Sequence, residues 1–239
     1  RIVALRAAEA ARAGRSAPAL AEVAGWAARG GPRVWERRGA TGRPLTVRLG
    51  QELVSGTDPV LVPHSGRRDL VREASAVADR RALVEVPATI DLDAVRVLGL
   101  VGPGEAATAL ARSLVAQLVG LVDPRHLDVE IRVPDERRHV WDWVHWLPHH
   151  HEGQRADGAA ARHLVVAEAG SGAAGALRQE LSRDDRVRVL WLAPTAAGLP
   201  DEVGAVARLG PERATIRRGD GPPTPFDPEP APLEVVEAL

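Results

Sequence analysis

Residues 95–109 read VRVLGLVGPGEAATA, and this stretch decides the fold. Its first part, Val95–Val101, is a short and nearly continuous apolar run, as expected for a strand that is buried on both faces of a parallel sheet. Gly102-Pro103-Gly104 interrupts that run. A helix is predicted over Glu105–Val122, because leucines recur on one stripe and alanine and valine on the stripe beside it. The stretch therefore predicts a strand, a tight glycine turn and a buried helix.

The same alternation of strands and helices continues on both sides of this stretch. Further strands are predicted at Val84–Leu92, Leu127–Val133, His163–Ala167 and Val187–Leu192, and further helices at Ala19–Arg29, Arg67–Arg81 and Gly175–Ser182. A hairpin is predicted where Val203–Leu209 and Ala214–Arg218 flank a Gly-Pro turn. Strands that alternate with helices at this spacing predict an α/β domain with a three-layer arrangement and a largely parallel sheet.

The two ends of the chain differ from this central pattern. Arg1–Arg15 has helical spacing, and Val34–Arg38 with Leu45–Leu49 predicts a hairpin around a Gly- and Pro-containing turn. Proline and aspartate dominate Gly219–Pro232, which indicates a linker, and Leu233 begins a helix. We therefore expect a helical stalk in residues 1–31, the α/β domain in residues 32–218, and a Pro-rich linker in residues 219–239. Because the first residue is not methionine, we expect a piece of a longer protein.

Composition excludes several functions. The 239 residues contain no lysine, so Schiff-base enzymes and lysine general bases are excluded. No cysteine is present, which excludes disulfides, thiolate zinc sites and cysteine nucleophiles. The net charge is −1, so nothing steers the chain toward nucleic acid or anionic lipid. The longest apolar run, Val97–Val101, is far shorter than the roughly 20 residues that span a membrane.

A strand, a glycine turn and a buried helix form the layout of a phosphate-binding loop, G-x-x-x-x-G-K-[ST]. In register from Gly102, alanine stands at the second glycine, Thr108 at the lysine and alanine at the hydroxyl position. Sliding the register by one residue makes Thr108 the hydroxyl but loses the first glycine. Pro103 removes an amide donor, and Glu105 places a carboxylate at the start of the helix beside Gly104. These residues predict a degenerate Walker A motif that binds no nucleotide.

The matching Walker B motif would be four apolar residues followed by an acidic pair. His163–Glu168 has this layout, but Ala167 stands where an aspartate would hold magnesium. Glu168 remains, and by itself it is interpreted as a surface carboxylate at the end of a strand. We therefore expect no catalytic residue, no cofactor and no metal.

Other sites are weighed against this interpretation. His145 and His149 have chelating i, i+4 spacing, with His139, His150, His151 and His163 nearby, but Pro148 interrupts the helix that would align them. The tryptophans at Trp141–Trp146 fit a core or interface helix better than a platform for single-stranded nucleic acid. Arginine pairs such as Arg137-Arg138 are interpreted as solvated surface. A residual nucleotide site with Arg112 in place of lysine is the alternative from another class. Ser65, Ser113 and Ser171 lack the context of a nucleophile.

Several segments resemble one protein family. They are Pro32–Arg38, Leu45–Gly50, Val86–Leu92, Val97–Pro103 and Trp141–His149. The chain resembles the membrane-proximal, degenerate ATPase-like domain of EccC-type ATPases, the FtsK/SpoIIIE-family motors of actinobacterial type VII secretion. The resemblance spans nearly the whole chain, although none of these segments is a catalytic motif.

This resemblance implies a RecA-like, P-loop NTPase-like fold and a role without catalysis. It implies a module that connects the membrane channel to downstream ATPase domains and contacts other subunits, in a parent protein that forms homo-oligomers. The parent would lie at the cytoplasmic face of the plasma membrane and contact the membrane through flanking segments, and no nucleic acid is expected. The alternative is a residual nucleotide-binding or hydrolysing domain of an FtsK-like DNA translocase.

Overall fold

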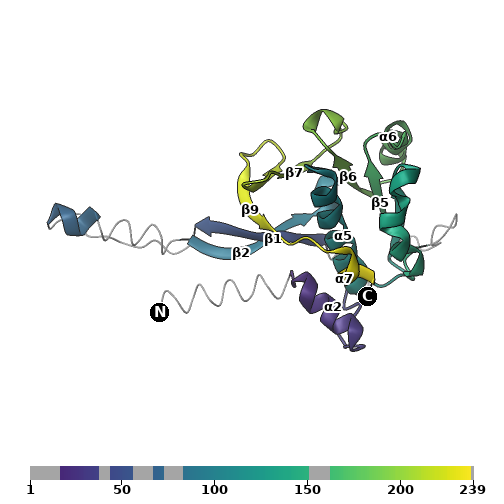
Figure 1. The fold of residues 1–239 in the computed structure, drawn as a ribbon, viewed down its shortest axis with the longest axis horizontal. Coiled ribbons are helices and arrows are strands. Elements are labelled where there is room, and N and C mark those ends of the chain that lie inside the picture. Colours follow the sequence, from purple (N-terminus) through teal and green to yellow (C-terminus); the bar gives the residue numbers. More distant parts are fainter. Residues whose placement is uncertain (1–16, 38–43, 56–66, 73–82, 151–161, 238–239) are drawn as a thin grey trace.

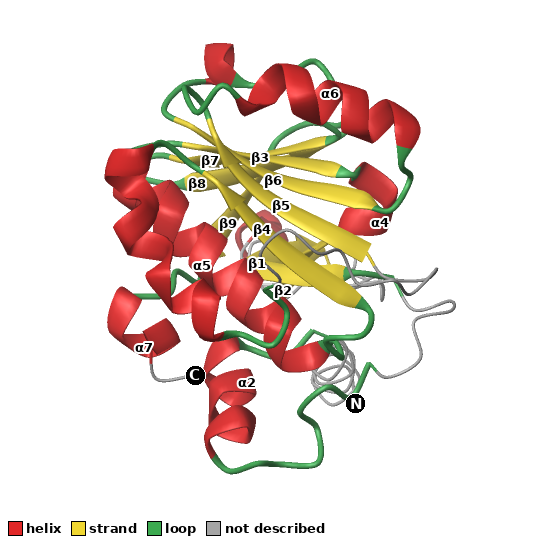
Figure 2. Cartoon of the chain, turned by 90° about the vertical axis from the view of Figure 1, so that its right-hand side faces the viewer, coloured by secondary structure: helices red, strands yellow, loops and turns green. Residues whose placement is uncertain are grey.

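The computed structural model describes residues 17–37, 44–55, 67–72, 83–150 and 162–237. Nine strands form one mixed sheet in the order β2-β1-β9-β8-β7-β3-β6-β5-β4. Helices cover both faces of its parallel half, with α5 on one side and α6 on the other (Figure 2). The three-layer α/β prediction is therefore confirmed, with half of the sheet antiparallel.

The parallel half contains the strands that the sequence predicts most clearly. β3 pairs with β6 on one side and with β7 on the other, and the order continues through β5 to β4, all in parallel register. The bounds are β3 Val97–Val101, β4 Leu127–Arg132, β5 Arg162–Glu168, β6 Val187–Ala193 and β7 Ala205–Leu209. The connecting helices are α4 Leu92–Val95, α5 Gly104–Leu121 and α6 Ala173–Arg183, with the 3-10 segment η1 Asp135–Trp146 and the short 3-10 turn η2 Ala196–Gly198.

The antiparallel half corrects the predicted N-terminal hairpin. β1 Thr46–Ser55 pairs along its whole length with β2 Leu83–Asp91. Val34 lies in a turn, and Arg37 makes a single parallel bridge to Val122 at the end of α5. The predicted pairing of residues 34–38 with 45–49 is therefore wrong. The apolar alternation of residues 45–49 is that of a strand, but its partner comes from far along the chain.

The Pro-rich stretch near the C-terminus corrects a second prediction. Within the predicted linker, β9 Thr224–Pro228 pairs with β8 Ala214–Arg218 on one side and with β1 on the other. Its contact with β1 is close, since a Cβ on Gly50 would lie 1.9 Å from the carbonyl oxygen of Asp227. The linker prediction is therefore wrong for residues 224–228, which form the strand between β1 and β8 (Figure 1). The predicted hairpin of β7 and β8 is confirmed.

The hydrophobic core has two parts. One lies under α5, whose residues are buried from Ala107 to Leu121. The other lies on the opposite face of the sheet, where Leu177 of α6 packs against Val165 and Trp191. α7 Leu233–Glu237 follows Ala231, whose amide donates to the carbonyl of Ala109 at 2.9 Å. The segment before α7 therefore lies against the N-terminal part of α5.

α2 Leu20–Ala28, within the predicted helix of residues 19–29, packs against α5. The closest approach is at Gly120, where a Cβ would lie 2.3 Å from Cγ1 of Val23. Replacing Gly120 with alanine should lower the free energy of unfolding by about 2 kcal/mol, because β-branched Val23 cannot turn aside freely. Urea denaturation measures this. Combined with Val23→Ala, the loss should fall below the sum of the two single losses, and simple additivity would contradict the contact.

Some predictions fall outside the residues that the structure describes. The predicted helix of Arg1–Arg15 lies there entirely, and of the predicted helix Arg67–Arg81 only residues 67–72 are described, of which 68–72 are helical. Within the described ranges, no helix is long and apolar enough to cross a membrane.

Candidate functional site

The turn between β3 and α5 is much shorter than a phosphate-binding loop. β3 ends at Val101 and α5 begins at Gly104, so only two residues lie between them. The motif G-x-x-x-x-G places four residues between its glycines alone. One of the two residues is Pro103, which has no amide proton. The amide of the other, Gly102, donates to the carbonyl of Ala193 at 3.2 Å, inside the sheet.

The residues aligned with the end of the Walker A motif lie on α5 itself. Ala107, Thr108 and Ala109 are all buried in the helix, and the Thr108 hydroxyl donates to the carbonyl of Gly104 at 2.7 Å. This is the usual back-bond of a threonine in a helix. In this conformation, the segment does not form a loop that could wrap around a phosphate group.

Arg112, the alternative to the missing lysine, has two structural contacts. It is 2% exposed, and its Nη2 donates to Glu105 at 2.6 Å while its Nε donates to the carbonyl of Ala231 at 3.1 Å. The guanidinium therefore joins the first turn of α5 to the segment before α7. Both of these contacts are made within the protein, so the Arg112 side chain is already occupied.

The Walker B positions lie at the end of β5. Ala167 is fully buried in the core part under α6. Glu168 has a side chain that is 16% exposed and accepts a hydrogen bond from Nε of Arg137 at 2.8 Å. Its interpretation as a solvated surface carboxylate is therefore wrong.

Arg137 joins the two degenerate motifs. While its Nε binds Glu168, its Nη2 donates to the hydroxyl of Thr108 at 2.6 Å. One guanidinium thus connects the Walker A threonine with the Walker B glutamate. It also lies beside the start of α5, because a Cβ on Gly104 would be 3.6 Å from its Nη1. The positive charge at this site therefore comes from an arginine outside both motifs.

Arg137 belongs to the 3-10 segment η1, and the buried side of this segment fixes its position. Trp141, Trp143 and Val144 are buried from its inner side, and the rings of the two tryptophans stack with centroids 6.3 Å apart. Of the predicted core or interface helix, the core position is confirmed for Trp141 and Trp143, on a 3-10 helix. Trp146 at its end is 89% exposed.

Sequence reasoning missed Arg137 as part of the site. It was grouped with Arg138 as solvated surface, and Arg138 does have a side chain that is 72% exposed, against 29% for Arg137. Nothing in the spacing of residues 108, 137 and 168 signals a contact, since the three come from different elements. The tryptophans after Arg137 are the usable signal, because they predict that one side of the segment is buried.

The histidines do not assemble a metal site in the described part of the chain, where no group of three or more suitable ligands occurs. The imidazole of His149 is buried and bonds the carbonyl of Val122 at 2.8 Å. His145 and His150 meet edge to face, with centroids 4.8 Å apart. The i, i+4 pair His145 and His149 therefore makes separate contacts, His145 with His150 and His149 with the end of α5.

A charge network on the outer strands makes stability depend on pH. Burial raises the pKa of Glu130, but hydrogen bonds with His163 and Arg132 outweigh it and lower the pKa to about 2. Because the pKa is lowered on folding, the carboxylate stabilises the protein above its unfolded pKa near 4.5, and this stability is lost as pH falls to about 2.

Replacing Glu130 with glutamine should therefore lower the free energy of unfolding at pH 7 by about 1 kcal/mol, a modest value because water screens a half-exposed pair. Urea titrations at several pH values measure the difference from the wild type, which should shrink as pH falls below about 4.5. A difference that is constant down to the acid range would show that the charge of Glu130 is not involved.

The chain is similar in sequence to proteins of bacterial secretion systems. No protein-family model matches the chain. It is 27% identical over 146 residues to the ESX-4 secretion system protein EccC4 of Mycobacterium tuberculosis strain H37Rv, which covers 59% of the chain and 12% of that protein. It is 32% identical over 155 residues to EccC5 of the ESX-5 system of M. tuberculosis strain CDC 1551, covering 58% and 10%. The chain thus spans about a tenth of the length of these curated relatives.

A solved structure has the same fold. The cytoplasmic domain of the Thermomonospora curvata type VII secretion ATPase EccC superposes with a TM-score of 0.53 over 85% of the chain and 32% of that structure, at 13% identity. The RecA-like fold and the EccC-like resemblance are both confirmed. The chain is therefore similar in sequence to a segment of the EccC proteins of ESX secretion systems and similar in fold to the cytoplasmic domain of a type VII secretion ATPase.

Proposed function

We propose that this chain is a non-catalytic, ATPase-like module of an EccC-like secretion motor. The observation that carries the proposal is the guanidinium of Arg137 between Thr108 and Glu168. In an active site of this layout, the threonine hydroxyl binds magnesium, the acidic residue positions the attacking water, and a lysine contacts the phosphates. Here both oxygen-bearing side chains bind an arginine of the same chain, and residues 102 and 103 form a short turn in place of a loop.

These residues do not fit a magnesium-bound triphosphate. The two-residue turn offers few free amides, Pro103 offers none, and Ala167 cannot coordinate a metal ion. Glu105 adds a negative charge at the first turn of α5, where a phosphate would otherwise gain from the helix dipole. We therefore expect that this module does not hydrolyse nucleotides.

The role that we propose is coupling through protein contacts. Relatives of the chain are named as secretion system proteins, and the matched region makes up only about a tenth of their length, so the module would act inside a larger protein. In that protein, residues 1–31 would lead from the membrane side, residues 32–218 with β9 would form the domain, and the segment after β9 would lead to the downstream ATPase domains. The parent would lie at the inner face of the plasma membrane and form homo-oligomers. The net charge of −1 gives no support for nucleic-acid binding.

Thermal unfolding with and without ATP and magnesium tests the nucleotide part of the proposal. A ligand present at 100 times its dissociation constant adds about 2.7 kcal/mol to the stability of the folded state. We expect no rise in Tm at millimolar ATP–Mg, for the wild type and equally for Arg137→Ala, because the turn remains too short after the arginine is removed. A rise in Tm for Arg137→Ala alone would show that the side chain of Arg137 by itself prevents nucleotide binding. A rise for the wild type would refute the proposal.

A further inference from the structure

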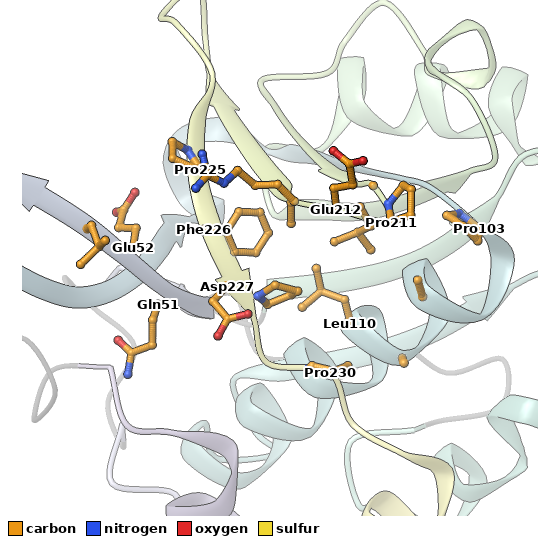
Figure 3. Close-up of a pocket in the computed structure, with 18 of the residues that line it drawn as sticks. Gln51, Glu52, Pro103, Leu110, Pro211, Glu212, Pro225, Phe226, Asp227 and Pro230 are labelled. Carbon is orange, nitrogen blue, oxygen red and sulfur yellow. The ribbon is translucent and has the colours of Figure 1, made fainter.

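A large groove lies beside the degenerate site. It has a volume of about 940 Å³ and runs between the first turns of α5, the β7–β8 turn, β9 and β1. Figure 3 shows Phe226 of β9 and Leu110 of α5 in its middle, with Glu52 and Glu212 on either side of Phe226. This volume lies at the upper end of the range for ligand sites, so the groove has room for several side chains together.

The floor of the groove is apolar and rigid. Leu110, Leu209 and Phe226 form it, and all three are buried in the core. Prolines surround it at positions 103, 211, 225, 228 and 230. Proline has a fixed φ and no amide proton, so these walls resist collapse and offer few donors to a polar ligand. The groove therefore suits an apolar anchor.

The rim of the groove is negative. Its carboxylates are those of Glu52, Glu85, Glu105, Glu212 and Asp227, and among the described residues that line it Arg213 is the one cation. Glu52 binds Arg218 at 2.9 Å and Glu105 binds Arg112 at 2.6 Å. The remaining three carboxylates are exposed and form no ion pair within the described parts of the chain.

We propose that this groove binds a positively charged peptide segment of a partner protein. Arginine or lysine side chains of the segment would pair with Glu85, Glu212 and Asp227, while an aliphatic side chain packs against Phe226 and the prolines around it. The apolar floor supplies affinity, and the charge of the rim supplies orientation and selectivity. The proposal rests on the coupling role proposed above and adds the chemistry of the partner. It excludes a nucleotide from the groove, because a triphosphate would meet three unpaired carboxylates.

The test uses the whole 239-residue chain and two fluorescent probe peptides in an anisotropy titration. One probe alternates arginine with leucine over eight residues, and the other alternates glutamate with leucine. We expect the basic probe to bind at least about ten-fold more tightly than the acidic probe at low salt, and to weaken as salt screens the rim. Binding of neither probe, or equal binding of both, would overturn the proposal.

Three variants locate the binding in the groove. Ala106→Trp fills the groove from an exposed position on α5. The double change Glu212→Gln with Asp227→Asn removes two rim charges. Each of these two variants should weaken binding of the basic probe about ten-fold. Arg213→Ala removes the opposing cation and should tighten binding several-fold, a gain that a misfolded variant cannot imitate. The matched control, Glu136→Gln with Asp142→Asn, removes two exposed carboxylates of η1 and should leave binding unchanged.

The alternatives give distinct results. If the control weakens binding as much as the groove variants, the probe responds to net charge alone and the proposal is wrong. If sedimentation shows a dimer that Ala106→Trp disperses, a second copy of this chain fills the groove, and the proposal is again wrong. Failure of the peptide test leaves the proposed pseudo-ATPase role standing, because that role is refuted by ATP binding and not by the absence of peptide binding.

Discussion

Replacing Trp141 with alanine is expected to lower the free energy of unfolding by about 4 kcal/mol, because a fully buried tryptophan leaves a large cavity. Trp141 is 1% exposed and stacks on Trp143 in η1. The same segment carries Arg137, so loosening it should also weaken the contacts of the guanidinium with Thr108 and Glu168. Urea denaturation followed by circular dichroism measures the loss.

Trp146→Ala is the matched control for this prediction. It removes the same side chain from the same 3-10 segment, at a position that is 89% exposed. Its effect should stay within about 0.5 kcal/mol, as is usual for surface substitutions. Equal losses for the two variants would contradict the burial of the inner side of η1 in the core.

Asp93→Asn is expected to lower the free energy of unfolding by about 3 kcal/mol, since it leaves two partly buried guanidinium groups without their counter-charge. Asp93 forms ion pairs with Arg162 and Arg188, both at 2.8 Å, and its side chain is 21% exposed. It also accepts a hydrogen bond from the amide of Leu45 at 2.9 Å. One carboxylate thus ties α4 to β5, β6 and the segment before β1.

The control is Asp201→Asn, the same chemical change in an ion pair with Arg178 where the aspartate is 97% exposed. It should cost at most about 0.5 kcal/mol. Burial raises the pKa of Asp93, but the bonds from Arg162 and Leu45 and the charge of Arg188 outweigh it, so the pKa is lowered. The stability from Asp93 is thus present above the unfolded pKa and lost as pH falls through the folded one. A loss for Asp93→Asn that does not shrink in acid would contradict the charge argument.

The sequence predicted those elements that bury a continuous apolar pattern. β3 is buried at every position and α5 carries two adjacent apolar stripes, so both could be located from periodicity alone. β9 could not be found in this way. Its five residues include Pro225, Asp227 and Pro228, a composition typical of a linker, and it is a strand because β1 and β8 offer it partners. Pairing between distant segments is a property of the whole fold and leaves no local signal.

The candidate site was predicted in part for the same reason. The sequence identified Gly102, Thr108, Ala167 and Glu168 as the positions where nucleotide motifs have degenerated. The predicted causes of the loss were missing residue types together with Pro103 and Glu105 at the start of the helix. The structure adds the guanidinium of Arg137. The short turn itself was predicted, since the helix was expected to begin at Glu105, one residue after its observed start. The contact of Arg137 was not, because residues 108, 137 and 168 come from different elements.

Calorimetric titration of ATP with magnesium into the purified 239-residue chain tests the central claim most directly. The account predicts only the heat of dilution up to millimolar ATP, since Thr108 and Glu168 are both bound to Arg137. A saturable heat with one site per chain and a dissociation constant in the micromolar range would contradict it.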